Sequence, residues 1–357
     1  MRTFSSINDP VFVKKQSYNF IDRFFLERIR DERDLPFVYL KLKILFFHIP
    51  FAIFLFTPVL TGWVWWVAAL AWFLVGAVLF IGAFTLMLHN TSHRKFYKQK
   101  YDWMNYMIPW VFGPFFGQSP ETYFGHHIGM HHSENNLKDD RSSTMYYQRD
   151  SLIDFFKYYG SFIAIGIIEL VDYFKSKNKP KFVKMVIRGE FTFVLLMILL
   201  AVFVSWKATL VVFALPFFGS RFGMMAGNWG QHAFVDRRDP ANNYLNSITC
   251  INHPYNKMCW NDGYHIGHHL RPHMHWTDMP GELLKNKDKY AANDAIVFEN
   301  IDFTGVWFLL MRKRYDKLAS HFVNLGDRYK SDEEVMKMLR SRTQKYESDY
   351  VYTPTPA

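Results

Sequence analysis

The sequence has few cysteines and lacks the motifs of nucleotide and serine-hydrolase chemistry. Its 357 residues include only Cys250 and Cys259, too few for a disulfide scaffold, a four-cysteine zinc site or a cysteine-ligated iron–sulfur cluster. This usage is typical of a reducing, intracellular compartment. No Walker loop, Gly-x-Gly-x-x-Gly or Gly-x-Ser-x-Gly is present, so nucleotide binding and serine hydrolysis have no supporting motif.

Charged residues are nearly absent from two long stretches. The first, residues 44–93, has none; as one helix it would be about 75 Å long, while the apolar core of a bilayer is about 30 Å thick. The chain must therefore turn back. Pro58 with Thr61-Gly62 supplies the break between spans expected near residues 44–61 and 63–88.

The second stretch, residues 191–235, contains only Lys207 and Arg221 as charged residues, and Ser205-Trp206-Lys207 marks its turn. Lys and Arg are abundant before the first span and in residues 94–188, whereas the expected hairpin turns carry a single Lys. By the positive-inside rule, the N-terminus, the central segment and the C-terminal region lie in the cytoplasm. No cleavable secretory signal precedes the first span.

Two further apolar stretches are not expected to cross the membrane. Residues 104–120 are uncharged but rich in Pro and Gly, which favours an interfacial or re-entrant piece. Residues 151–175 carry charged side chains around an apolar centre, as in an amphipathic helix on the membrane surface. If either crossed, the number of spans and the sidedness would change.

The chain is therefore predicted to be an all-α integral membrane protein, with four transmembrane helices in two hairpins and a cytosolic helical cap. Its net charge of +10 fits a nucleic acid or an anionic membrane surface; the apolar runs decide for membrane lipid, and no nucleic-acid partner is expected. The predicted segments are a cytosolic N-terminal segment (1–43), hairpin 1 (44–93), a cytosolic or interfacial segment (94–190), hairpin 2 (191–235) and a cytosolic C-terminal cap (236–357) with helical patterns near residues 301–322 and 331–346.

Histidines gather at the expected cytosolic ends of the spans. Ten of the 15 histidines fall in the four motifs HNTSH, HHIGMHH, NWGQH and HIGHH. His89 and His93 are spaced i, i+4, as are His127 and His131, and each pair is expected on one helix face. In HIGHH the spacing i, i+3, i+4 lets adjacent ligands point toward two different metal ions.

This clustering indicates metal binding. A single interfacial histidine is an ordinary polar residue, but four groups on one membrane face would, without metal, bury unpaired polar groups or repelling charges. The imidazoles exceed what one tetrahedral zinc uses, and thiolates are scarce, so we expect two non-haem irons with nitrogen-rich shells. A transporter would instead carry ionisable groups near the midplane, and a membrane haem protein would carry facing histidine pairs within its spans.

In chain order, HNTSH, HIGMHH and HIGHH match the three histidine boxes, His-x(3,4)-His, His-x(2,3)-His-His and His-x-x-His-His, of the membrane fatty acid desaturase and hydroxylase superfamily, which the chain resembles over residues 40–280. NWGQH is similar to the Asn-x-x-x-His element that precedes the third box in stearoyl-CoA desaturases. The resemblance implies iron ligation by nine histidines and by Asn228, directly or through water. The nine are His89, His93, His127, His131, His132, His232, His265, His268 and His269.

The resemblance also implies an O2-dependent oxidoreductase that acts on long fatty acyl chains entering from the bilayer, in the first place a fatty acid desaturase. Hydroxylation of a fatty acid or alkane and oxidative decarboxylation to a terminal alkene, on the same di-iron site, are alternatives. The three-residue spacers of the first two boxes are those of membrane alkane hydroxylases. Because no cytochrome b5, flavin or nicotinamide motif is present, electrons are expected from a separate protein of ferredoxin or cytochrome b5 type.

Other residues near the motifs have two interpretations. His126 is expected beside the ligands, and structural or surface roles are expected for His48, His253, His273 and His275. Nearby carboxylates either accept hydrogen bonds from ligand imidazoles or stay solvated. They are Glu134, Asp139, Asp140, Asp236 and Asp262.

Arg221 and the glycines around it are also open. An ionised group within a span is costly, so Arg221 either meets a substrate carboxylate, snorkels, or pairs with a residue such as Glu190. Gly219, Gly223 and Gly227 form a small-residue face that favours close helix packing, with a slot for an acyl chain as the alternative.

Overall fold

The computed structural model describes residues 1–4 and 6–347, so the end of the predicted cap, residues 348–357, lies outside the described part. The described chain is mostly helical, as predicted, and divides into two compact units. Unit 1 comprises residues 1–11, 129–173 and 222–357, and unit 2 comprises residues 12–128 and 174–221. The two units are defined by which residues pack together, whereas the segments predicted from the sequence are defined by where the chain is expected to cross the membrane.

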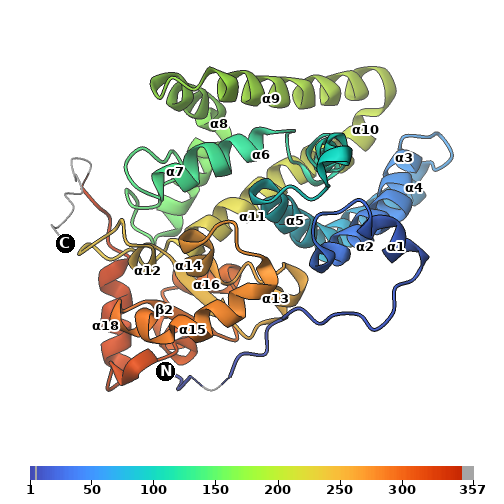
Figure 1. Ribbon diagram of the computed structural model, residues 1–357. Coiled ribbons are helices and arrows are strands. Elements are labelled where there is room, and N and C mark those ends of the chain that lie inside the picture. Colours follow the sequence, from blue (N-terminus) through green and yellow to red (C-terminus); the bar gives the residue numbers. More distant parts are fainter. Residues whose placement is uncertain (5, 348–357) are drawn as a thin grey trace. The chain divides into compact units, whose positions relative to one another are not determined.

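Figure 1 labels the helices and strands along the chain. Unit 2 contains α1 (Phe20–Leu26), α2 (Leu35–Lys43), α3 (Ile49–Leu55), α4 (Gly62–Val75), α5 (Ile81–His93), α6 (Thr122–Phe124), α9 (Pro180–Leu200), α10 (Trp206–Thr209) and the first part of α11 (Leu215–Gln231). Unit 1 contains the rest of α11, α7 (His132–Glu134), most of α8 (Leu152–Ser176), α12 (Asn243–Asn246), β1 (Ile248–Ile251), α13 (Pro254–Met258), α14 (His265–Leu270), α15 (Met279–Ala292), β2 (Ile296–Glu299), α16 (Phe303–Met311), α17 (Tyr315–His321) and α18 (Asp332–Arg342).

Three helical stretches in the described chain are long and apolar enough to cross a membrane: Glu32–Leu55, Gly62–His93 and Pro180–Gln231. The first begins at Glu32 rather than near residue 44, because the charge of Lys41 does not end the helix. Its ammonium lies 4.1 and 4.2 Å from the ring centroids of Phe96 and Tyr97, which compensates part of the cost of burying it.

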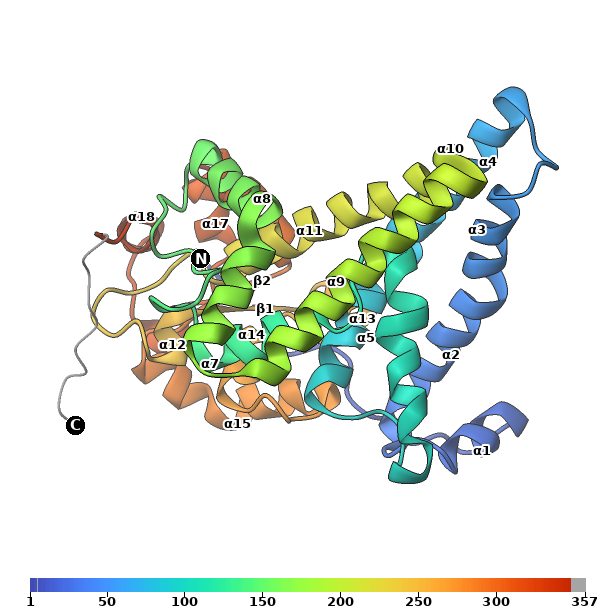
Figure 2. The ribbon, with the colours of Figure 1, turned by 90° about the horizontal axis from the view of Figure 1, so that it is seen from above.

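The third stretch is interrupted in its middle. As one helix it would be about 78 Å long, more than twice the thickness of a bilayer core. At Ser205 the backbone is extended (φ −160°, ψ 108°), and the Ser205 hydroxyl accepts a hydrogen bond from the Ala208 amide as the cap of α10. Figure 2 shows the chain reversing direction between α9 and α11 at this place. The break lies where the sequence predicted a turn, while the count of four spans stays a prediction.

The apolar core of unit 2 contains the imidazole of His48. Its ring stacks between Trp72 and Phe116, with centroids 4.5 and 5.1 Å away. Gly76 makes room for it, because a Cβ there would lie 2.8 Å from His48 Cε1. His48 therefore has the structural role expected from the sequence.

The loop that precedes the second histidine motif is held against α9. A Cβ on Gly189 would lie 1.7 Å from the Pro120 carbonyl oxygen, so only glycine permits this approach. Glu121, which has φ +61°, pairs with Arg188 on the same helix. This unusual backbone conformation for glutamate is thus stabilised by contacts on either side of the close approach.

Arg221 belongs to this arrangement. Its guanidinium lies 3.2 Å from the Glu190 carboxylate and donates hydrogen bonds to the Ser119 hydroxyl and the Gly117 carbonyl, each at 3.1 Å. The ion pair joins α11, α9 and the loop in one buried network. Of the interpretations left open by the sequence, pairing with Glu190 is the one that the structure favours.

The expectation of close helix packing along the small-residue face of α11 was wrong. A Cβ placed on Gly219, Gly223 or Gly227 would meet no described atom within 4 Å. Close packing requires a neighbouring helix within contact distance, and spacing in a sequence does not reveal whether one is present.

Replacing Gly189 with alanine should destabilise the protein by about 1–3 kcal/mol, because the added methyl group displaces the Pro120 carbonyl. The matched control is Gly219→Ala, which places the same methyl group in open space on a helix. This control should leave stability unchanged or raise it by up to about 1 kcal/mol. Thermal unfolding in detergent measures both variants; equal melting temperatures would refute the assigned close approach.

Unit 1 contains the strands that the all-α prediction missed. β1 and β2 pair in parallel, with Ile248 opposite Ile296 and Cys250 opposite Phe298. Each strand has only four residues, ITCI and IVFE, and runs this short do not distinguish a strand from a buried helix. They pack in a core with residues of α16, α17 and α18, and both cysteines are buried and form no disulfide.

Arg149 lies in the interior of unit 1 and links distant segments of it by hydrogen bonds. Its side chain is fully buried and donates hydrogen bonds to the carbonyl oxygens of Ala233, Arg342 and Gln344 at 3.0, 2.8 and 2.8 Å. Burial lowers the pKa of Arg149 to about 10, so the group stays protonated at neutral pH. The guanidinium thus ties the end of α11 to the segment that follows α18.

Candidate metal centre

Four histidines of unit 1 come together, and they are called here the four-histidine cluster: His131, His232, His265 and His269. Their donor nitrogens lie within 4.8 Å of one another. The His265 Nε2 atom is 3.2 Å from the Nε2 of His232 and 3.0 Å from that of His269. Four Nε2-bearing ring edges that converge in this way form a nitrogen-rich donor set.

The cluster is assembled from three parts of the chain. His265 and His269 lie one turn apart on α14, and His232 follows directly on α11. His131 ends the π-helical turn Gly125–His131. The i, i+4 face predicted for His127 and His131 assumed an α-helix, which this segment is not; π-helical turns have a different repeat and are frequent at functional sites.

Hydrogen bonds fix the tautomers of two cluster members. The His232 Nδ1–H donates to the carbonyl and side-chain oxygens of Asn246, at 3.0 and 2.9 Å. The His131 Nδ1–H donates to the Asp140 carboxylate at 2.7 Å. Both arrangements leave the Nε2 lone pair toward the cluster, which is the orientation that a metal ligand requires.

Two members of the cluster, His232 and His269, have a lowered pKa, which favours their neutral form. Burial, and then the neighbouring His131, lower the pKa of His232 to about 4. Burial likewise holds the pKa of His269 well below its usual value, and the adjacent His265 adds to this effect. Neutral imidazole is the form that binds metal.

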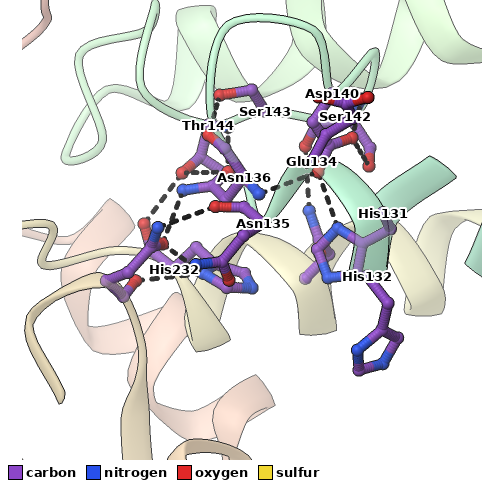
Figure 3. A network of polar contacts seen from close by, with 12 residues as sticks. His131, His132, Glu134, Asn135, Asn136, Asp140, Ser142, Ser143, Thr144 and His232 are labelled. Atoms are coloured by element: carbon purple, nitrogen blue, oxygen red, sulfur yellow. Dashed lines mark hydrogen bonds and ion pairs between the residues drawn. The ribbon is translucent and has the colours of Figure 1, made fainter. Parts of the chain in front are cut away.

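Asp140 is the carboxylate that supports this cluster. One of its oxygens accepts hydrogen bonds from His131 and from the Asn136 amide at 3.1 Å, and the other from the Ser142 amide and hydroxyl at 2.8 and 2.6 Å (Figure 3). Three of the other carboxylates near the motifs contact different groups. Glu134 accepts from Tyr173, Asp236 pairs with Arg238 and Arg342, and Asp262 accepts from Tyr255.

Two further histidines of unit 1, the histidine pair His132 and His268, face each other separately. Their Nε2 atoms are 2.9 Å apart. His131 and His269 belong to the four-histidine cluster, whereas the residues next to them in the sequence, His132 and His268, form the histidine pair. Adjacent histidines thus belong to different groups. This is the divergence of adjacent ligands that the spacing predicted.

Unit 2 gathers the histidine trio His89, His93 and His127. Their donor atoms lie within 4.8 Å of one another, and the Nε2 atoms of His93 and His127 are 3.0 Å apart. His89 and His93 leave one face of α5, as predicted. The ring of Tyr123 stacks on that of His127 with centroids 5.3 Å apart.

The remaining candidates lie outside these groups. Asn228 donates hydrogen bonds from Nδ2 to the Ser142 carbonyl at 3.0 Å and to the Tyr158 hydroxyl at 2.7 Å. His253 and His275 cap short helices, and His126 and His273 are not among the grouped donors of the described chain. Sequence reasoning missed Asn246, Asn136, Ser142 and Tyr158, because their residue types carry no metal-ligand spacing.

The family model described as fatty acid desaturase matches residues 63–298, about two thirds of the chain and all the grouped histidines. The chain belongs to the fatty acid desaturase family. The family predicted from the histidine boxes is thereby confirmed. Membership of this family implies an oxidoreductase of the fatty acyl type, and together with the three apolar helical stretches it indicates a membrane protein. Comparisons with curated proteins and with solved structures gave no match.

This desaturase-family chain has the donor chemistry that iron requires. The histidine groups offer imidazoles whose Nε2 atoms face one another, and Asp140 places a buried carboxylate behind one of them. Imidazole is a suitable ligand for iron, and a carboxylate behind it raises its basicity. The residues present therefore fit the metal that the family uses.

Replacing Asp140 with asparagine should lower iron affinity about 10–100-fold, as is usual for the partner of a ligating histidine. Asp139→Asn removes the same charge one residue away and should change affinity about twofold or less. Titration of the purified protein with ferrous iron under anaerobic conditions measures both. An equal loss in the two variants would show a general charge effect and would contradict the role assigned to Asp140.

Proposed function

We propose that this protein is an O2-dependent, non-haem di-iron desaturase that introduces a double bond into long fatty acyl chains. The observation that carries the proposal is the four-histidine cluster, assembled from distant segments within a chain of the fatty acid desaturase family. It would hold one iron, and the other predicted histidine ligands would serve the second. The ligand roles of the nine histidines and of Asn228 remain proposals.

Bound iron would supply, with O2, the oxidising power that a saturated C–H bond requires and that no side chain offers. The protein's own residues do the rest. Asp140 and Asn246 hold the Nδ1 protons of His131 and His232, so each ring keeps its Nε2 lone pair directed at the metal. Burial lowers the pKa of His232 to about 4, so protons do not compete with a metal for this ring at neutral pH.

A cavity in unit 2 supports an acyl substrate. It has a volume of about 230 Å³, and part of its wall is apolar, with Leu88, Ile108, Phe124 and Met185. Polar and charged residues, among them Lys95, Asp102 and Glu121, form the rest of the lining. Tyr123, whose ring stacks on His127, forms part of the same wall. Burying methylene groups against the apolar side chains is favourable by about 0.8 kcal/mol each, so an alkyl chain is the ligand that suits this part of the lining.

We propose that the protein spans the membrane four times, with both termini in the cytoplasm. The interruption at Ser205 supports a fourth span, because it divides the longest candidate stretch into two helices of membrane-spanning length. The electron donor is proposed to be a separate ferredoxin or cytochrome b5, and the net charge of +10 suits an acidic partner.

Hydroxylation is the second candidate, and a specific observation favours it. The spacers in HNTSH and HIGMHH are three residues long, as in membrane alkane hydroxylases. Mass spectrometry of lipids from a host expressing the protein separates the outcomes. Desaturation removes two hydrogens, hydroxylation adds one oxygen, and decarboxylation yields a terminal alkene; new lipids of none of these kinds would refute the proposal.

His268→Ala should abolish product formation and lower bound iron, because it removes one imidazole of the histidine pair. His273→Ala, on an exposed residue of the same region, should retain both and is the matched control. Iron is measured by elemental analysis of the purified variants, together with their lipid products. Full iron and full turnover in His268→Ala would contradict the ligand assignment.

A further inference from the structure

Ser142 connects two metal-facing parts of unit 1. Its amide and hydroxyl both donate to one Asp140 oxygen, while the other oxygen accepts from His131. Its carbonyl accepts hydrogen bonds from Asn228 and from the Tyr158 hydroxyl, at 3.0 and 3.1 Å. Ser142 is fully buried, so no water replaces these bonds without opening the structure.

These contacts determine which way the Asn228 side chain points. Both hydrogens of Nδ2 are engaged, one by the Ser142 carbonyl and the other by the Tyr158 hydroxyl at 2.7 Å. Exchanging the amide oxygen and nitrogen would place Oδ1 against the Ser142 carbonyl, two acceptors facing each other. The amide orientation therefore follows from its partners, and Oδ1 is left as the atom without a hydrogen bond among the described residues.

Tyr158 provides a second hydrogen-bond acceptor for the Asn228 amide, in addition to the Ser142 carbonyl. Its hydroxyl donates to Ser142, so its oxygen lone pair faces Asn228 as an acceptor. The phenol is held in place by its ring, which packs edge-on against Trp229 with centroids 5.1 Å apart and is 3% exposed. A rigid, buried acceptor of this kind selects one side-chain conformation for Asn228.

We propose that Tyr158 is a positioning residue that directs the Asn228 Oδ1 atom toward the metal, or toward a water bound to it. Asn228 lies one helical turn before His232, a member of the four-histidine cluster, and the His232 amide donates to the Asn228 carbonyl at 3.0 Å. The side chains of these two residues therefore leave the same side of the chain. This inference rests on the proposed metal centre.

Tyr158→Phe tests the proposal, because it removes only the hydroxyl and keeps the ring packing. The variant should remain folded, with a melting temperature somewhat below that of the wild type because two buried hydrogen bonds are lost. It should lower the affinity for cobalt(II) about 10–100-fold and alter the visible absorption of the bound cobalt, which reports the ligand geometry. Tyr159→Phe removes a hydroxyl from the next residue of α8, whose ring packs against Phe155 and Phe222. This control should behave as the wild type.

A second comparison identifies the route of the effect. If Tyr158 acts through Asn228, then Asn228→Ala should produce the same loss, and the double variant should bind cobalt no more weakly than Asn228→Ala alone. Additive losses, or an unchanged spectrum in Tyr158→Phe, would overturn the proposal. Failure of the wild-type protein to bind cobalt or iron would instead refute the proposed metal centre itself.

Discussion

The arrangement of this protein depends on buried imidazoles whose lone pairs face one another. In the four-histidine cluster, the His265 Nε2 atom lies 3.2 Å from the Nε2 of His232 and 3.0 Å from that of His269. Burial lowers the pKa of His232 and of His269, which favours their neutral form. Ring nitrogens that share a small buried space satisfy one another incompletely, and such groups are costly. A bound metal ion would replace these contacts with bonds to the nitrogens, and this is the physical basis of the proposed metal centre.

That constraint explains the polar shell around the cluster. A ring that donates a hydrogen bond from Nδ1 has its lone pair on Nε2. The hydrogen-bond acceptors of His131 and His232 differ in charge. Asp140 is anionic and held by four hydrogen bonds, while Asn246 is neutral and buried. As metal ligands, the two rings would therefore have unequal basicity. In unit 2, Gly189 and the ion pair between Arg221 and Glu190 fix the loop that leads to His127, which makes backbone packing part of the construction of the site.

The sequence predicted the parts of the structure that have a strong local signal. Long uncharged runs gave the apolar helices, Ser205 gave the break between α9 and α10, and the histidine spacing gave both the family and the divergence of His268 from His269. The signal failed where a feature depends on distant neighbours. Lys41 lies inside a helix because two aromatic rings cover it, and the strands β1 and β2 are too short to be recognised from periodicity. No atom of residues 1–4 or 6–347 comes within 4 Å of a Cβ added to Gly219, Gly223 or Gly227, so their spacing did not indicate close helix packing. Tyr158 and Ser142 could not be found from spacing, since their role arises from segments that meet only in the folded chain.

X-ray absorption at the iron edge of the purified, iron-loaded protein tests the central claim most directly. The account predicts a first shell of nitrogen and oxygen only, with the outer-shell scattering pattern of several imidazole rings per iron, because the converging donors are histidines and both cysteines lie buried in reduced form away from the grouped donors. Sulfur in the first shell, or iron without imidazole scattering, would contradict it.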